Sequence, residues 1–102
     1  MSSPGDGQPL RYNVHISGQT QSALQQLHLQ ARAAGRSKRF LAAVQQIIER
    51  LQNEPLNLGE PLYGLPALQL LVCQAVVDFV VVDYAVHEER PLVFIRGFKL
   101  LG

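Results

Sequence analysis

Two basic residues near the end of the chain, Arg96 and Lys99, are the first candidates for chemistry. They stand in the apolar segment 92–100, and cations of this kind stabilise negative charge that develops at a phosphate during catalysis. Asp83, in the preceding apolar segment, shares a face with Arg96 if the two segments pair as a regular antiparallel hairpin. We favour an ion pair between the two strands; the alternative is a pair of polar groups inside a binding groove.

The basic cluster of the chain consists of Arg36, Lys38 and Arg39. These cations stand at the start of a predicted helix, where positive charge opposes the helix dipole. That arrangement makes the cluster a candidate contact for a nucleic-acid phosphate or for an acidic partner. The alternative is a solvated helix end, since exposed charges cost little stability.

The sequence contains no motif for metal binding, for a phosphate-binding loop or for a catalytic nucleophile. His15, His28 and His87 are far apart and do not have the spacing of metal ligands. The sequence shows no glycine-rich phosphate loop, nucleophile elbow or zinc motif, so we expect neither a metal nor a cofactor. Cys73 and Tyr84 stand in apolar runs and are expected to fill the core. A single cysteine cannot form an intrachain disulfide and fits a reducing compartment.

The composition predicts a folded domain. Hydrophobic residues make up 47% of the chain and charged residues 17%, and nine basic against eight acidic residues give a net charge of +1. Such a balance gives no overall reason to expect nucleic-acid binding. Charged and polar residues interrupt the apolar region 70–86, so it is too short to span a membrane. We expect a cytoplasmic protein with a flexible tail over residues 1–10 and one domain over residues 11–102.

Apolar periodicity predicts a strand and two helices in the first half. Residues 11–16 alternate as a half-buried strand, and residues 19–34 repeat apolar side chains every three or four positions, with Ser17 or Thr20 as cap. A second helix begins with Ser37 as its cap and ends before Pro55. Its apolar stripe consists of Phe40, Leu41, Val44, Ile47, Ile48 and Leu51.

The second half of the sequence is predicted to form a loop and three strands. Proline and glycine mark residues 54–66 as a loop, and the apolar segments 67–73, 79–87 and 92–100 are predicted strands. The charged turn 88–91 is short, so the last two strands form an antiparallel hairpin. The expected fold is α+β with the order β-α-α-β-β-β, in which a helical hairpin packs on one face of an antiparallel sheet.

The other face of that sheet is expected to be apolar as well. Regular alternation places Phe79, Val81, Asp83, Phe94 and Phe98 on it. A large exposed apolar patch usually marks an interface. These residues are therefore the predicted partner interface. A homodimer would cover the patch, and so would the loop 54–66 or the N-terminal tail.

This order of elements resembles the RelE/ParE toxin superfamily of bacterial toxin–antitoxin systems, which are of the plasmid stabilisation type. The residues that carry the resemblance are the segments Leu62-Tyr63-Gly64-Leu65-Pro66, Phe79-Val80-Val81-Val82-Asp83-Tyr84-Ala85-Val86 and Leu92-Val93-Phe94-Ile95-Arg96-Gly97-Phe98-Lys99. The resemblance implies a bacterial toxin that an antitoxin neutralises by wrapping over the helices and the sheet.

The resemblance also bears on activity. Ribonuclease members of the family place basic residues on the open sheet face to cleave mRNA on the ribosome. Here the segment 68–73 contains no Lys or Arg, and Asp78-Phe79-Val80 lacks the expected arginine. We therefore expect a toxin-like protein that lacks the ribonuclease site and acts through protein contacts, either as a gyrase-directed toxin or as a family member that has lost catalysis. The alternatives are an mRNA endonuclease that uses Arg96 and Lys99, and a homodimeric module without toxin activity.

Overall fold

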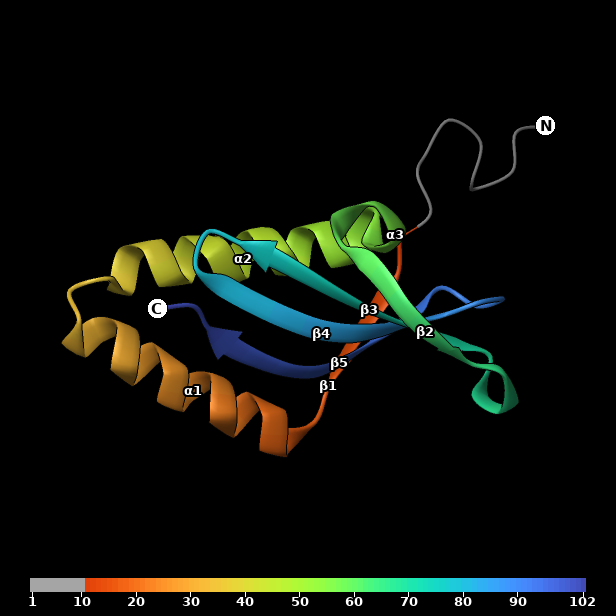
Figure 1. Ribbon diagram of the computed structural model, residues 1–102, viewed down its shortest axis with the longest axis horizontal. Coiled ribbons are helices and arrows are strands. Elements are labelled where there is room, and N and C mark those ends of the chain that lie inside the picture. The colour runs from red at the N-terminus through yellow and green to blue at the C-terminus, as the bar shows by residue number, and fades with distance from the viewer. Residues whose placement is uncertain (1–10) are drawn as a thin grey trace.

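The computed structural model describes residues 11–102, and the expected N-terminal tail, residues 1–10, lies outside them (Figure 1). The elements in chain order are β1 (Asn13–Ile16), α1 (Gly18–Ala33), α2 (Ser37–Asn53), α3 (Pro55–Leu58), β2 (Glu60–Leu65), the 3-10 helix η1 (Pro66–Leu68), β3 (Leu70–Val77), β4 (Val80–His87) and β5 (Leu92–Leu100).

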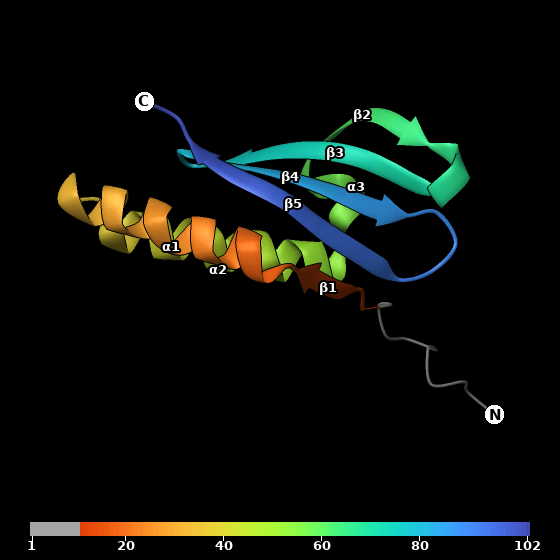
Figure 2. The same ribbon diagram turned by 90° about the horizontal axis from the view of Figure 1, so that it is seen from below.

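The strands form one sheet in the order β1-β5-β4-β3-β2, antiparallel except for the parallel pair β1 and β5. The hairpin of α1 and α2 lies along one face of this sheet, and the other face carries no helix of residues 11–102 (Figure 2). The predicted α+β class, with a helical hairpin on one sheet face, is confirmed.

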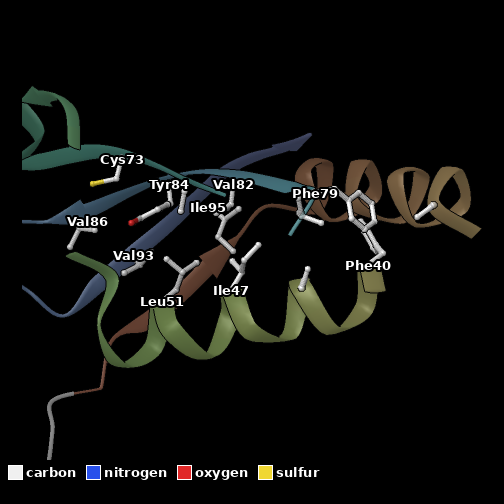
Figure 3. Close-up of a cluster of buried hydrophobic side chains, with 14 residues drawn as sticks. Phe40, Ile47, Leu51, Cys73, Phe79, Val82, Tyr84, Val86, Val93 and Ile95 are labelled. Atoms are coloured by element: carbon white, nitrogen blue, oxygen red, sulfur yellow. The ribbon is translucent and has the colours of Figure 1, made fainter. Parts of the chain in front are cut away.

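The core lies between α2 and the middle of the sheet (Figure 3). The buried side chains of α2 are Phe40, Ala43, Ile47 and Leu51, which pack against Val80, Val82, Tyr84 and Val86 of β4 and Val93 and Ile95 of β5. Leu41, predicted to belong to the buried stripe, is 50% exposed. At about 3.6 residues per turn it points to the side of the stripe, whereas Ala43 points inward.

The two helix starts differ from each other. The Ser17 side chain caps α1 by accepting a hydrogen bond from the Thr20 N–H at 3.1 Å. The predicted cap of α2 by Ser37 is wrong, because Arg36 occupies the cap position and makes no side-chain cap bond. Ser37 instead pairs its Oγ with Nε2 of His28 at 2.9 Å. Between the helices Gly35 adopts a φ of +73°, a conformation that side chains disfavour.

The predicted loop 54–66 is partly wrong, because it contains α3 and the edge strand β2. An edge strand pairs on one side only, so it tolerates Pro61 and Gly64, which make the segment look like a loop. The next strand also begins later than predicted, at Leu70 rather than residue 67. The 3-10 helix η1 and Gln69, with a φ of +54°, occupy the intervening positions.

A bulge in β5 changes which face two aromatic residues occupy. Asp83 is opposite Gly97 and Tyr84 is opposite Ile95, which leaves Arg96 as the extra residue. Phe98 therefore lies opposite Val82 and packs against the helix-side core, contrary to the prediction.

Phe79 likewise leaves the predicted patch. It lies in the turn between β3 and β4, is 5% exposed and belongs to the helix-side core. The face assignments of Phe79 and Phe98 are thus corrected. Val81 and Phe94 remain on the open face, where they lie opposite Lys99 and Ala85.

Candidate functional site

A groove of about 370 Å³ lies on the open face of the sheet. Four strands supply its lining: Leu62 and Tyr63 of β2, Val72 and Gln74 of β3, Asp83 of β4 and Arg96 of β5. The set combines a guanidinium, a carboxylate, an amide and a phenol with apolar walls. It is therefore suited to bind a ligand that presents both charged and apolar groups.

Two bulges place residues in this groove. Arg96 is the extra residue of β5, and in β2 the register shifts between Pro61 and Tyr63, around Leu62. A bulge bends its strand and redirects side chains, and bulges are frequent beside functional sites. The register irregularities of this sheet thus coincide with the groove.

A hydrogen bond joins the two sides of the groove. Arg96 Nη1 donates to the Tyr63 hydroxyl at 3.0 Å, although β4 and β3 separate their strands in the sheet. Val72, which lines the groove, and Ala85 of β4 are each only 2% exposed. Tyr63 lies opposite Val72 and Phe94 lies opposite Ala85, so each of these two small side chains has a longer one beside it on the neighbouring strand.

Asp83 and Arg96 line the same groove but do not form the ion pair that we favoured. Gln74 Nε2 donates to Asp83 Oδ1 at 2.8 Å. The ion pairs within residues 11–102 are Arg39–Asp78 and Arg50–Glu54. The physical reason is the bulge, which places Gly97 opposite Asp83. The favoured ion pair is therefore absent, and the two side chains line one groove with separate hydrogen-bond partners.

Lys99, the other cation proposed for catalysis, is exposed on β5 opposite Val81. It is not among the residues that line the groove. The structure thus places Arg96, but not Lys99, beside a second polar group that could share chemistry with it.

The predicted basic cluster holds the end of a hairpin. The guanidinium carbon atoms of Arg36 and Arg39 lie 4.1 Å and 5.4 Å from the centre of the Phe79 ring. Arg39 Nε also donates to Asp78 Oδ2 at 3.0 Å, and this hydrogen bond is the main cause that lowers the pKa of the Asp78 carboxyl. Both arginines therefore join the β3–β4 turn to the start of α2, while Lys38 is exposed.

The two buried groups that could react are core residues, as predicted. The Tyr84 hydroxyl is fully buried and donates to the Pro55 carbonyl at 2.6 Å. Burial raises the pKa of Tyr84 above its ordinary value, and it does the same to the Cys73 thiol. Both groups thus remain protonated at neutral pH, and neither reaches the groove.

Sequence reasoning missed three groove residues, Leu62, Tyr63 and Gln74, as parts of a site. Leu62 and Tyr63 stood in the predicted loop, and Gln74 was only an interruption in an apolar run. Gln74 beside Asp83 was the available signal, since a paired hairpin brings polar residues of neighbouring strands face to face.

The fold and the groove together define a class of protein: an α+β domain whose sheet carries helices on one face and a mixed polar and apolar groove on the other. Within residues 11–102 no group of three or more His, Cys, Asp or Glu side chains could hold a metal ion. Among the described helices none has the length and apolar character needed to cross a membrane. Comparisons with protein families, with curated proteins and with solved structures find no match.

Proposed function

We propose that the chain is a RelE/ParE-like toxin component of a bacterial toxin–antitoxin system and that it acts through protein–protein contacts. The observation that carries the proposal is the sheet face without a helix, where two bulges build a groove around Arg96. The order of one strand, a helical hairpin and an antiparallel set of strands supports the resemblance to this superfamily. The single Cys73 fits a reducing compartment, so we place the activity in the cytoplasm.

The charges of the open face favour a protein as target. Arg96 and Lys99 are accompanied there by Glu60 and Asp83. Binding to a nucleic-acid chain depends on neutralising several phosphates with an excess of cations, and that excess is lacking among the described residues of this face. Exposed apolar side chains such as Leu62 suit a protein contact.

A metal-free mRNA endonuclease is the second candidate, and the hydrogen bond between Arg96 and Tyr63 favours it. A phenol can transfer a proton and a guanidinium can stabilise charge at a phosphate. The carboxylate of Asp83 in the same groove opposes the binding of a phosphate. The homodimer interpretation has lost part of its support, because Phe79 and Phe98 pack in the helix-side core.

Induced expression in bacteria tests the proposal. We expect the wild-type chain to arrest growth while mRNA stays intact, and co-expression of an antitoxin encoded beside it to restore growth. Arg96→Gln should abolish the arrest. Arg90→Gln, which removes an exposed arginine of the β4–β5 turn, is the matched control and should keep it.

The other outcomes separate the alternatives. Growth arrest with cleaved mRNA would establish the nuclease, and arrest with DNA damage would identify gyrase as the target. Normal growth at good soluble expression would contradict both toxin interpretations.

A further inference from the structure

We propose that the open-face groove binds one carboxylate side chain of a linear segment of a protein partner, with Arg96 as the anchor and Tyr63 as the second donor. We call the group of Arg96, Tyr63, Asp83 and Gln74 the acid socket. The proposal rests on the proposed function, because it names the chemistry by which the open face would recognise a protein.

The first argument is the unbalanced charge of Arg96. Its guanidinium has several N–H donors, and Tyr63 accepts a hydrogen bond from one nitrogen. No carboxylate of residues 11–102 forms an ion pair with it, although Asp83 lines the same groove. Guanidinium groups bind carboxylates through two parallel hydrogen bonds. Arg96 is thus complementary to an acidic ligand.

Tyr63 gives the socket a second donor. Its hydroxyl oxygen accepts the hydrogen bond from Arg96 at 3.0 Å, so its own proton is available to another acceptor. One oxygen of a carboxylate can accept a hydrogen bond from the Tyr63 hydroxyl, and the other can accept hydrogen bonds from N–H groups of Arg96. Binding therefore needs no break in the bond between Arg96 and Tyr63. The Tyr63 side chain is 50% exposed, so a ligand from solvent can reach it.

Asp83 and Gln74 select what accompanies the carboxylate. The negative charge of Asp83 penalises a ligand with several charges, such as a phosphodiester chain, more than a ligand with one. Gln74 donates a hydrogen bond to Oδ1 of Asp83, while Oδ2 can accept a hydrogen bond from an N–H group of the ligand. A peptide offers a single carboxylate, backbone N–H groups and apolar neighbours that can contact Leu62 and Val72. These features favour a peptide over RNA as the occupant.

The experiment uses a phage-displayed library of random linear peptides, selected on the full wild-type chain and counter-selected on Arg96→Gln. We expect the enriched peptides to share one Asp or Glu beside apolar residues. In fluorescence polarisation, Arg96→Gln and the peptide's own acid-to-amide change should each weaken binding about tenfold or more. The two changes together should cost little more than either alone, because both remove the same contact.

Further variants test each member of the socket. Tyr63→Phe should weaken binding several-fold through loss of one donor, and Asp83→Asn should strengthen the binding of acidic peptides by removing a like charge. Arg90→Gln is the control and should leave affinity unchanged. Urea denaturation of Arg96→Gln should match that of the wild type, so that lost binding is not caused by unfolding.

Several results would overturn the proposal. They are a selection without binders, enriched peptides that lack an acid, or affinity that does not respond to Arg96→Gln. Tighter, Arg96-dependent binding of a mixed-sequence single-stranded RNA would assign the socket to nucleic acid instead. The growth assay keeps the two proposals apart: arrest by the wild type together with a failed peptide selection removes the socket alone, whereas acid-dependent peptide binding without arrest removes the toxin function alone.

Discussion

The two faces of the sheet differ although the same strands build both. On the helix side, β4 presents Val80, Val82 and Tyr84, all fully buried, in strict alternation. On the open side the same strand presents Asp83, which lines the groove together with Arg96 from a bulge. Regular pairing thus produces the core, and interruptions of that pairing produce the groove.

Because of this difference, we expect the helix side of the sheet to determine stability and the open side to determine binding. The free energy of folding comes mainly from apolar burial on the helix side. The groove adds polar groups that are partly exposed and joined by single hydrogen bonds, whose net contribution to stability is small. Variants of the helix side should therefore change the free energy of unfolding, and variants of the groove should change binding.

The largest expected effect is on the helix side. Ile47→Ala removes a side chain with 0% exposure and should lower the free energy of unfolding by about 2–5 kcal/mol. Leu41→Ala is the matched control on the same helix and should cost about 1 kcal/mol or less, because Leu41 is half exposed. Urea denaturation measures both. Equal losses would contradict the position of the core.

A second variant should connect the two faces. At Gly59→Ala the new Cβ would lie 2.3 Å from the Gln74 carbonyl oxygen and 2.8 Å from the Ala75 Cβ, so backbone has to move. Such overpacking costs about 1–3 kcal/mol. We expect β2 to shift from β3, which moves Tyr63 away from Arg96 and weakens peptide binding.

The control for this variant is Gly18→Ala, where an added Cβ meets no atom within 4 Å. It should retain both stability and binding. Unchanged peptide binding in Gly59→Ala would show that the groove does not depend on the pairing of β2 with β3.

Periodicity made the helix side predictable from the sequence. The stripe of α2 and the alternation of Val80, Val82, Tyr84 and Val86 report directly which side chains face the core. The helix α2 and the strand β4 each keep one period over their whole length, so an error at an end does not change their buried face. The prediction for Leu41 is wrong because this position lies to the side of the stripe of Phe40, Ala43, Ile47 and Leu51, where it is 50% exposed.

The open face could not be predicted in the same way. A bulge adds one residue to a strand, and every side chain beyond it changes face relative to the expected alternation. Nothing in residue types marks Arg96 as that extra residue, so Phe98 was assigned to the wrong face. Tyr63 was missed as a groove residue because Pro61 and Gly64 make an edge strand look like a loop.

A smaller effect is expected at the Tyr84 hydroxyl. Tyr84→Phe leaves the buried Pro55 carbonyl without its donor and should cost about 1–3 kcal/mol at neutral pH. Burial raises the pKa of Tyr84 above its ordinary value of 10.0. As pH rises, the unfolded chain therefore loses this proton before the folded chain does. The contribution of Tyr84 to stability is complete below the ordinary pKa and decreases as pH rises from there toward the higher pKa of the folded state.

Urea midpoints between about pH 8 and about pH 11 measure this slope. The wild type should lose stability over the upper part of that range, and Tyr84→Phe should lose less. Part of the slope should remain in the variant, because burial also raises the pKa of Cys73. An unchanged slope in Tyr84→Phe would contradict the burial of an ionisable group at this position.

The smallest effect concerns Asp78, whose ion pair with Arg39 holds the hairpin end against α2. Because the hydrogen bond from Arg39 lowers the pKa of Asp78 below its ordinary value of 3.8, the pair stabilises the fold above that value. The contribution disappears as pH falls through the lower pKa of the folded state. Asp78→Asn should therefore have a slightly lower melting temperature than the wild type near neutral pH.

Melting curves in acid complete this test. The difference between wild type and Asp78→Asn should shrink there, whereas Glu49→Gln, on the exposed face of α2, should show no ion-pair loss at neutral pH. A difference that persists in acid would mean that the turn depends on the shape of Asp78 rather than on its charge. The ion pair between Arg39 and Asp78 would then contribute nothing to stability, and the arginines of the basic cluster would again be candidates for contact with an acidic partner.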